Sequence, residues 1–331
     1  KASHSPTLSR TPRSIGREDC KRSACLVREK VSEAFNPHSP LVVQSLIGRI
    51  SLPFYLRCLQ SLLDHCEEDI SLLVHEDGSL DEKDREQAQR QLGGKANFAD
   101  LKKTREKTLD HLSGRPHCQA IRRDSLWGIE FFDPLFAHAD DPISFYLDAD
   151  ILFLRPFFGL FNRNQVEGGA IFIKDTQWDA YSLRPWHLFG FGKRPAIVKG
   201  ITTALVCWDK RIIDWDYLEW FLSETRLHRM KEWVLPTAQS GLATRCQSKV
   251  VCPQQLPNLY PNGQITDQTF GVHLLGSYRE SWLVKLEELE QQMKQSKPAI
   301  QAQFSPCQSC GSLSYAGNQL KRWINTRLNQ W

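Results

Sequence analysis

The chain has 331 residues, of which 41% are hydrophobic and 24% charged, enough for one large α/β domain or two small ones. A formal net charge of +4 is no argument for a nucleic-acid partner, and we expect none. No stretch approaches the roughly 20 uninterrupted apolar residues of a membrane helix, so we expect no transmembrane segment in this chain. Because the chain begins with Lys1, we expect a fragment or processed product, and we leave the compartment open with the cytoplasm slightly favoured.

Ten cysteines occur at irregular spacing, and Cys307 and Cys310 form a lone CxxC pair. A structural zinc site usually needs two such pairs with tight spacing. We therefore favour mostly reduced, buried thiols over a zinc site.

The first half of the chain predicts a βαβ unit. Residues 1–40 are rich in Ser, Pro, Arg and Lys, which indicates a flexible or peripheral arm. A β-branched strand at 41–47, an amphipathic helix at 52–65 and a second strand at 70–75 follow. This order implies a parallel sheet with helical crossovers.

The remaining elements continue the α/β pattern. We expect one or two exposed helices between 79 and 112, then an apolar helix at 126–136 that stops near Pro134. Strands are expected at 143–147, 169–173, 204–208 and 271–275, and helices at 217–223, 238–245 and 283–295. The predicted fold is therefore a single large α/β domain at 41–296, a mostly parallel sheet flanked by helices, followed by a C-terminal extension at 297–331.

Asp148 and Asp150 stand where the buried strand at 143–147 ends. Ligands of open α/β sheets bind at the carboxyl ends of the strands, and an i, i+2 spacing puts both carboxylates on one face of an extended segment. Two carboxylates this close repel each other unless a cation lies between them. Hard oxygen ligands predict Mg²⁺ or Mn²⁺. The alternative is a capping Asp beside a solvated one.

A second group of residues lies in the apolar segment 271–279. His273 is a candidate third metal ligand, although a histidine in such a strand is more often a satisfied core residue. Gly276 permits close approach of a phosphate, and Arg279 can neutralise diphosphate oxygens. An imidazole ligand favours Mn²⁺ over Mg²⁺.

With these motifs the chain resembles glycosyltransferases of the GT-A fold, over roughly residues 41–286. The segment from Asp148 to Asp150 is similar to that family's metal-binding DxD, and His273-x-x-Gly276 is similar to the HxxGxxK motif of its retaining members, with Arg279 in place of Lys. The resemblance implies a Rossmann-like fold. It also implies a UDP- or GDP-sugar donor, and a saccharide, lipid or protein acceptor that the sequence does not identify.

Further donor contacts are implied by position alone. The resemblance places Ser45 on the first strand, Asp77 in the acidic turn after the second strand, and Arg122 and Arg123 before the DxD strand. Together with Asp148, Gly276 and Arg279 these are the expected donor-binding residues. The Asn-Ser-Gly and Glu-Gln-Thr motifs of the family are absent from 200–206 and 235–239.

The mechanism that the resemblance implies is metal assistance to departure of the nucleoside diphosphate. An inverting enzyme also needs a carboxylate base near the acceptor hydroxyl. We expect Asp175 first, at the end of the 169–173 strand, and Asp216 second. The other acids considered are Asp179, Asp214 and Asp267, and each one taken singly is more often a solvated loop acid.

An aromatic-rich loop follows the 169–173 strand and contains Trp178, Tyr181, Trp186 and Phe189. Sugars stack on aromatic rings, which makes the loop a candidate acceptor platform. Dense aromatic residues are more often packing elements, and we favour packing here.

Three other functions compete with glycosyl transfer. A HAD-type phosphohydrolase has a strand-end DxD, but that motif normally opens the domain. A nucleotidyltransferase normally carries a glycine-rich loop after its first strand, whereas only Gly48 is present here. The third is an inactive GT-A-like interaction protein, which the missing acceptor-side motifs keep open.

Overall fold

The computed structural model describes residues 40–138, 140–176, 181–188, 194–261, 263–276, 278–283, 285 and 298–328, and of 322, 323 and 325–328 the backbone only. The chain divides into residues 1–39 and a second unit, Pro40–Trp331, to which all described residues belong. The predicted N-terminal arm therefore lies outside the described residues.

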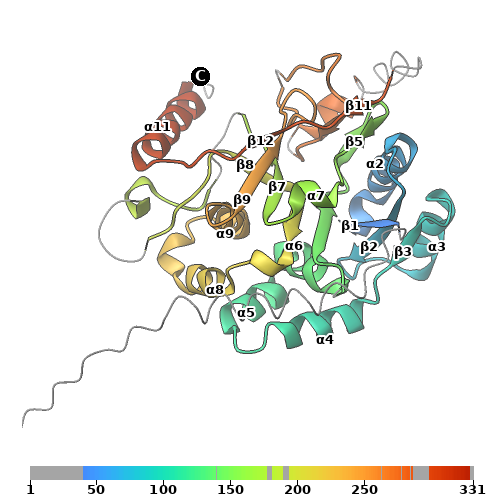
Figure 1. Ribbon diagram of the computed structural model, residues 1–331, viewed down its shortest axis with the longest axis horizontal. Coiled ribbons are helices and arrows are strands. Elements are labelled where there is room, and N and C mark those ends of the chain that lie inside the picture. Colours follow the sequence, from blue (N-terminus) through green and yellow to red (C-terminus); the bar gives the residue numbers. More distant parts are fainter. Residues whose placement is uncertain are drawn as a thin grey trace, which may run out of the picture. The chain divides into compact units, whose positions relative to one another are not determined.

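An eight-stranded sheet forms the centre of the unit (Figure 1). Its strand order is β12 (Phe304–Pro306), β9 (Gln247–Val251), β7 (Gly169–Lys174), β8 (Ile201–Asp209), β4 (Ile143–Leu147), β1 (Leu41–Ile47), β2 (Ile70–Glu76) and β3 (Ala96–Phe98). The run β4-β1-β2-β3 and the pair β7-β9 are parallel, whereas β8 is antiparallel to both of its neighbours and β12 to β9. The predicted α/β architecture with a mostly parallel sheet is confirmed.

The described residues also form two separate two-stranded sheets. β10 (Gly271–His273) pairs antiparallel with β5 (Ile151–Phe153), and β11 (Ile300–Gln301) pairs parallel with β6 (Phe157–Phe158).

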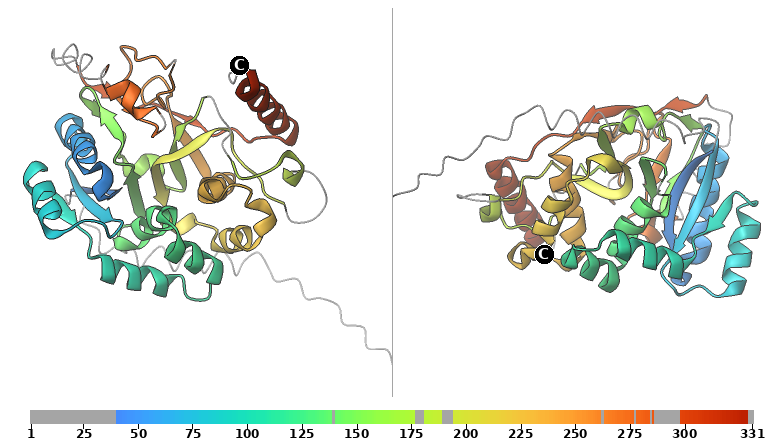
Figure 2. Two further views of the ribbon diagram at one scale, coloured as in Figure 1. Left: turned by 180° about the vertical axis from the view of Figure 1, so that it is seen from behind. Right: turned by 60° about the horizontal axis from the view of Figure 1, so that its bottom comes forward.

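Helices cover both faces of the sheet, as the two further views show (Figure 2). Their bounds are α2 (Leu52–His65), α3 (Glu82–Gln91), α4 (Leu101–His111), α5 (Pro116–Asp124), α6 (Leu126–Ala137), α7 (Arg163–Val166), α8 (Trp215–Ser223), α9 (Val234–Ala243) and α11 (Ser312–Leu328). Short 3₁₀ turns occur at η1 (Arg49–Ser51), η2 (Pro185–Leu188), η3 (Lys210–Ile212), η4 (Thr225–Leu227) and η5 (Lys231–Trp233). No helix within the described residues is long and apolar enough to cross a membrane.

The alternation of side chains along the central strands builds two hydrophobic cores. Leu205 and Cys207 of β8 pack into the core beneath α2, whereas Val206 and Trp208 pack into the core beneath α6, α8 and α9. Because successive side chains of a strand point to opposite faces, one apolar strand supplies both cores. The DxD turn leaves this sheet from β4, all five residues of which are buried.

Local patterns predicted many of these elements well. The bounds of β1, α2 and β4 are those expected, and β2, β7, β8, β10, α8 and α9 overlap their predicted ranges. Two details were wrong. The charged region after β2 contains a strand, β3, between its two helices, and α6 continues through Pro134 to Ala137. The helix expected at 283–295 lies almost entirely outside the described residues.

The segment predicted as a C-terminal extension is continuous with the domain. Its strands β11 and β12 pair with β6 and β9, and α11 packs beside η2. Ser312 Oγ donates to the Leu188 carbonyl (3.0 Å), and Tyr315 Oη donates to the Leu183 carbonyl (2.8 Å). A boundary at 296/297 therefore does not separate two structural units.

Candidate active site

Strand pairing brings the DxD turn and His273 together although they are more than 120 residues apart in the chain. Asp148 and Asp150 lie in the turn between β4 and β5, where the Asp148 amide donates to the Ala204 carbonyl (2.7 Å). β10 pairs antiparallel with β5 so that His273 stands opposite Ile151. This register sets the imidazole beside the Asp150 carboxylate.

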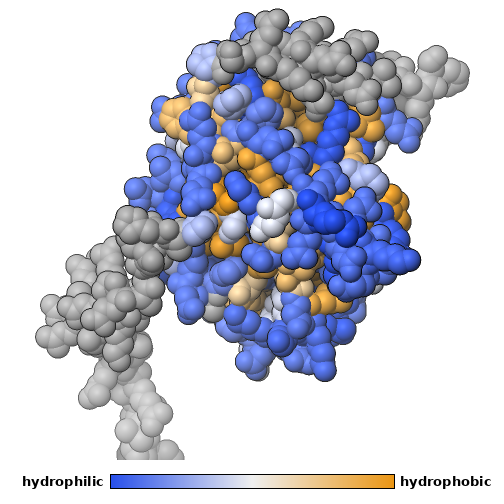
Figure 3. Space-filling model, turned by 90° about the vertical axis from the view of Figure 1, so that its right-hand side faces the viewer, coloured by the Kyte–Doolittle hydropathy of each residue, from blue (hydrophilic) through white to orange (hydrophobic). Residues whose placement is uncertain are grey.

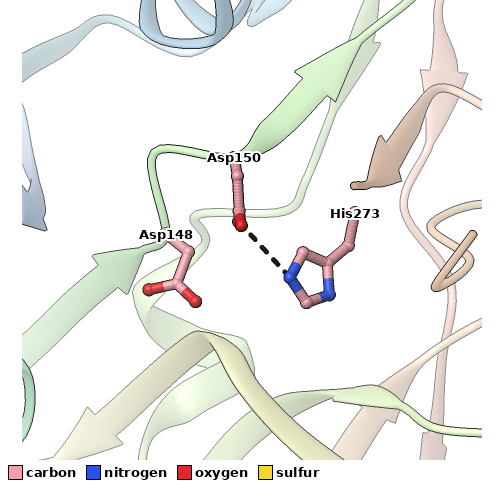
Figure 4. A group of neighbouring side chains, drawn as sticks. All are labelled: Asp148, Asp150 and His273. Carbon is pink, nitrogen blue, oxygen red and sulfur yellow. Dashed lines mark ion pairs between the residues drawn. The ribbon is translucent and has the colours of Figure 1, made fainter. Parts of the chain in front are cut away.

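The three side chains converge on one point (Figure 4). One ligand atom from each of Asp148, Asp150 and His273 lies within 4.8 Å of the other two. His273 Nε2 is 3.3 Å from Asp150 Oδ1. Carboxylate and imidazole donors at this separation can share a single small divalent cation.

A buried amide holds the imidazole in the orientation that metal binding requires. His273 Nδ1–H donates to Asn258 Oδ1 (2.8 Å), and both residues are buried. Because Nδ1 is engaged by Asn258, Nε2 is the nitrogen that faces the carboxylates and is available to bind a cation. Metal-bound histidines in general have such a partner on the second ring nitrogen, which fixes tautomer and ring orientation.

The carboxylates, in contrast, are incompletely satisfied. Tyr146 Oη donates to one oxygen of Asp148 (2.8 Å), while Asp150 Oδ1 has no hydrogen-bond partner despite its burial. Burial and the nearby Asp150 charge raise the pKa of Asp148 to about 7. A carboxylate that resists ionisation, beside a second one with an unpaired buried oxygen, fits a site completed by a cation.

Arg279 provides fixed positive charge next to this centre. Its Nη2 donates to Asp150 Oδ2 (2.9 Å), and its guanidinium lies 4.5 Å from the ring centre of Phe54 and 5.7 Å from that of Tyr55. The stacking fixes the plane of the guanidinium. The predicted proximity of Arg279 to the metal ligands is therefore present in the structure.

Asp148 and Asp150 lie on the wall of a cavity of about 910 Å³. On one side it is lined by Leu46 at the end of β1 and Tyr55 of α2. The opposite wall consists of residues from α5, α6, η4, η5 and α9 and the turns beside them: Ile121, Asp124, Ser125, Leu126, Trp127, Glu130, Thr225, His228, Lys231, Val234 and Leu235. Binding pockets for small molecules commonly measure roughly 300–1,000 Å³, so the cavity can hold a sizeable ligand.

The close packing of α5 against α6 shapes that opposite wall. A Cβ atom on Gly128 would overlap the backbone of Ile121 and Arg122, so only glycine lets the two helices approach this closely. The close approach places Leu126 and Trp127 at the cavity, where they are 53% and 42% exposed.

Two further acids line the cavity, and the sequence patterns identified neither the exposed Asp124 nor the partly buried Glu130. The Glu130 carboxylate hydrogen-bonds with Thr203, and burial together with the Asp148 charge raises its pKa well above the usual value. One signal was available in the sequence, because Glu130 is the only charged residue in the otherwise apolar stretch 126–132. No sequence pattern pointed to Asn258 as the partner of His273. The contact between Tyr146 and Asp148 could have been expected, because their i, i+2 spacing on an extended segment places both side chains on one face.

The structure does not bring every predicted donor-binding residue to the cavity. Arg122 is buried and forms a bidentate ion pair with Asp133 at 2.5 and 2.6 Å, so the geometry does not support a donor contact. Arg123 is exposed, with Gln119 Oε1 at 3.4 Å from its guanidinium, and Ser45 is fully buried on β1. Neither is among the described residues that line the cavity.

Asp77 and Gly276 take other positions. Asp77 follows β2, packs against Gly48 and accepts a hydrogen bond from the Ser79 amide (2.9 Å), which makes it part of the turn at this edge of the sheet. Gly276 follows β10, and a Cβ atom there would meet nothing within 4 Å. No neighbouring part of the described chain therefore requires glycine at position 276.

The predicted catalytic acids lie outside the cavity wall. Asp175 accepts a hydrogen bond from the buried Tyr260 hydroxyl (2.8 Å), on the His273 side of the centre. Asp216 is exposed in the first turn of α8. Neither is among the described cavity-lining residues, whereas Glu130 is.

The other acids and the aromatic loop that the sequence suggested are also absent from the described cavity lining. Asp214 caps α8 and pairs with Arg245 (2.7 Å), Asp267 is exposed, and Asp179 lies outside the described residues. In the aromatic loop Tyr181 is buried and donates to the Val198 carbonyl (2.7 Å), while Trp186 is 59% exposed.

The cysteines of the described residues are buried or partly buried. Cys58, Cys118, Cys207 and Cys310 are buried, and Cys66, Cys246, Cys252 and Cys307 are partly buried.

No family model and no curated protein matches the chain. Among solved structures it is similar to the galactosyltransferase LgtC in complex with donor and acceptor sugar analogues, at 12% identity and a TM-score of 0.46, over 78% of this chain and 98% of that one. It is also similar to the Mn/GDP form of core-mannan synthase A from Aspergillus fumigatus, at 10% identity and a TM-score of 0.40, over 66% of this chain and 74% of that one. A third is the bifunctional glycosyltransferase WbbM, at 9% identity and a TM-score of 0.45, where 73% of this chain spans 47% of that one.

Proposed function

We propose that this chain is a metal-dependent glycosyltransferase that moves a sugar from a nucleotide-diphosphate-sugar to an acceptor. The observation that carries the proposal is the convergence of Asp148, Asp150 and His273 on one point at a cavity of about 910 Å³. The ligand set of two carboxylates and one imidazole favours Mn²⁺, with Mg²⁺ as the alternative.

In this proposal the donor lies between the metal ligands and the β1 side of the cavity. Tyr55 offers a ring face to the nucleoside, and Arg279 lies close enough to Asp150 to face the diphosphate as well. A UDP- or GDP-sugar meets these requirements. When bound, the cation would supply Lewis-acid assistance to departure of the diphosphate.

Residues around the candidate metal ligands hold them in this arrangement. Asn258 keeps the proton of His273 on Nδ1, and Tyr146 orients Asp148. Arg279 adds positive charge where negative charge develops on the leaving group. In the transfer, the acceptor oxygen bonds to the anomeric carbon and the bond from that carbon to the diphosphate breaks.

The acceptor side of the proposal centres on Glu130, Leu126 and Trp127. We choose Glu130 as the group that accepts the proton of the acceptor hydroxyl, because its carboxylate lines the cavity whereas Asp175 and Asp216 do not. The exposed faces of Leu126 and Trp127 offer an apolar wall on which a sugar ring can stack.

The test is a screen of UDP- and GDP-sugars for Mn²⁺-dependent hydrolysis or transfer. We expect one donor to turn over in the presence of Mn²⁺ and to lose about 10²-fold or more of its rate in Asp150→Asn. Asp216→Asn is the matched control, because this acid is exposed on α8 away from the cavity lining, and its rate should equal that of the parent chain.

Binding provides a readout that does not depend on the acceptor. Calorimetry with UDP and GDP should show affinity that requires Mn²⁺ and disappears in Asp150→Asn. Absence of metal-dependent binding or turnover with every donor would refute the proposal and favour a non-enzymatic interaction protein.

A further inference from the structure

The outer face of α11 is apolar and has no partner within the described residues. Leu313, Leu320 and Ile324 are 81%, 58% and 41% exposed. At 100° per residue these three positions lie within about 40° of one another on the helix. They therefore form a continuous stripe along it, which we call the α11 stripe.

The stripe points away from the domain. Tyr315, which is fully buried and anchors α11 through its hydrogen bond to the Leu183 carbonyl, stands about 200° around the helix from Leu313. The helix thus packs through one face and presents a second apolar face outward. Figures 1 and 2 show α11 at the periphery, on the opposite side of the unit from α3.

A further aromatic residue stands beside this helix. Trp186 of η2, which packs against α11, is 59% exposed, and the Arg184 guanidinium lies 5.0 Å from the centre of its ring. For comparison, the face drawn in Figure 3 is mostly hydrophilic, with apolar side chains in small groups. Grouped exposed apolar residues usually mark an interaction surface, whereas single ones need no explanation.

The charge of the segment indicates the kind of partner. Residues 298–331 contain Lys321, Arg322 and Arg327 and no Asp or Glu. Lys321 is exposed, and a helix with an apolar stripe, an exposed basic residue and no acidic ones is complementary to an anionic lipid surface, in which the stripe enters the interface and Lys321 faces the headgroups. Interfacial tryptophan is typical of such segments.

Two other occupants fit less well. A second copy would bring two basic helices together, and three aliphatic side chains on one helix are far fewer than the roughly 20–30 residues a side of a stable protein interface. Residues 1–39 of this chain contain eight basic and four acidic residues, the same sign of charge as α11. Charge therefore favours the lipid surface over both.

We propose that the α11 stripe, together with Trp186, binds the surface of an anionic lipid bilayer. The helix lies in the plane of the interface rather than across the membrane. This surface is separate from the cavity, so the proposal is independent of the proposed glycosyl transfer.

The test is flotation of the full chain with two kinds of vesicle, one of phosphatidylcholine alone and one containing about a third phosphatidylserine. The second kind carries the negative surface charge that attracts basic segments. We expect the chain to float with the anionic vesicles and to be released by high salt. The double variant Leu320→Asp and Ile324→Asp should weaken binding by about tenfold or more. Lys321→Glu, which removes a positive charge and adds a negative one, should weaken it by at least about fivefold.

Leu101→Asp is the matched control, because Leu101 is 37% exposed on α4 and belongs to no such stripe. It should float like the parent chain. Far-UV circular dichroism establishes that each variant is folded, and if the double variant is not, Lys321→Glu alone decides the test. Failure of the parent chain to bind either vesicle, equal binding by folded stripe variants, or a dimer that the stripe variants dissociate would overturn the proposal.

Discussion

Replacing Asn258 with leucine should impair metal binding without touching a metal ligand. In the parent chain Asn258 Oδ1 accepts the Nδ1–H of His273 at 2.8 Å, so Nε2, which faces Asp150 at 3.3 Å, is the nitrogen that can exchange its proton for a cation. Leucine is similar in size and accepts no hydrogen bond. The proton of His273 then favours Nε2, where the Asp150 carboxylate can accept it, and this tautomer cannot bind a cation.

The size of the effect follows from the burial of the pair. Asn258 and His273 are each 6% exposed, so water does not replace the lost acceptor. Loss of a partner that orients a metal-bound histidine typically lowers metal affinity about 10–100-fold, which corresponds to about 1.4–2.7 kcal/mol. Asn258→Asp keeps an acceptor in place and adds negative charge, so its affinity should be at least that of the parent chain.

Titration calorimetry or electron paramagnetic resonance with Mn²⁺ measures this difference directly. Asn164→Leu makes the same chemical change at an exposed position before β7 and serves as the control. A folded Asn258→Leu chain whose Mn²⁺ affinity stays within about threefold of the parent chain would refute the role of the amide, as would equal losses in Asn258→Asp.

Three further predictions concern stability. Burial and the Asp150 charge raise the pKa of Asp148 to about 7, so the metal-free fold loses stability as the pH rises from about 4 to 7. The Asp148→Asn variant should therefore have a higher Tm than the parent chain at pH 8 but not at pH 4. Gly128→Ala should cost more than about 1 kcal/mol in urea unfolding, whereas Gly317→Ala, with open space at its Cβ position, should be neutral or stabilising. Arg122→Met should cost about 3–5 kcal/mol by leaving Asp133 buried and unpaired, and the double variant with Asp133→Leu should recover stability. A stable double variant with weakened donor binding would restore a donor role for Arg122.

Much of the fold was predictable because its signals are local. The β-branched run of β1, the amphipathic spacing of α2 and the buried run of β4 each lie within a few consecutive residues. β3 was missed because Ala96–Phe98 is short and lies between two highly charged helices. Its strand character comes from pairing with β2, which no local pattern encodes.

The candidate metal centre was predictable for a different reason. The strand-end position of Asp148 and Asp150 is local, but the approach of His273 depends on the β5–β10 pairing. The sequence suggested it through a resemblance to known motifs, and the structure brings the three side chains together. Asn258 was missed because its neighbours have no repeating pattern and its partner lies 15 residues away.

The cavity wall opposite the metal ligands could not be predicted from sequence spacing at all. Arg122 illustrates the difficulty, since its charge suggested a donor contact and its true partner, Asp133, becomes adjacent only when α5 packs on α6. That packing depends on Gly128, whose absent side chain carries no chemical signal. The same contact turns Trp127 and Glu130 toward the cavity. The residues that would select an acceptor in the proposed function are therefore positioned by helix packing, and a change at Gly128 should alter acceptor preference before it alters metal affinity.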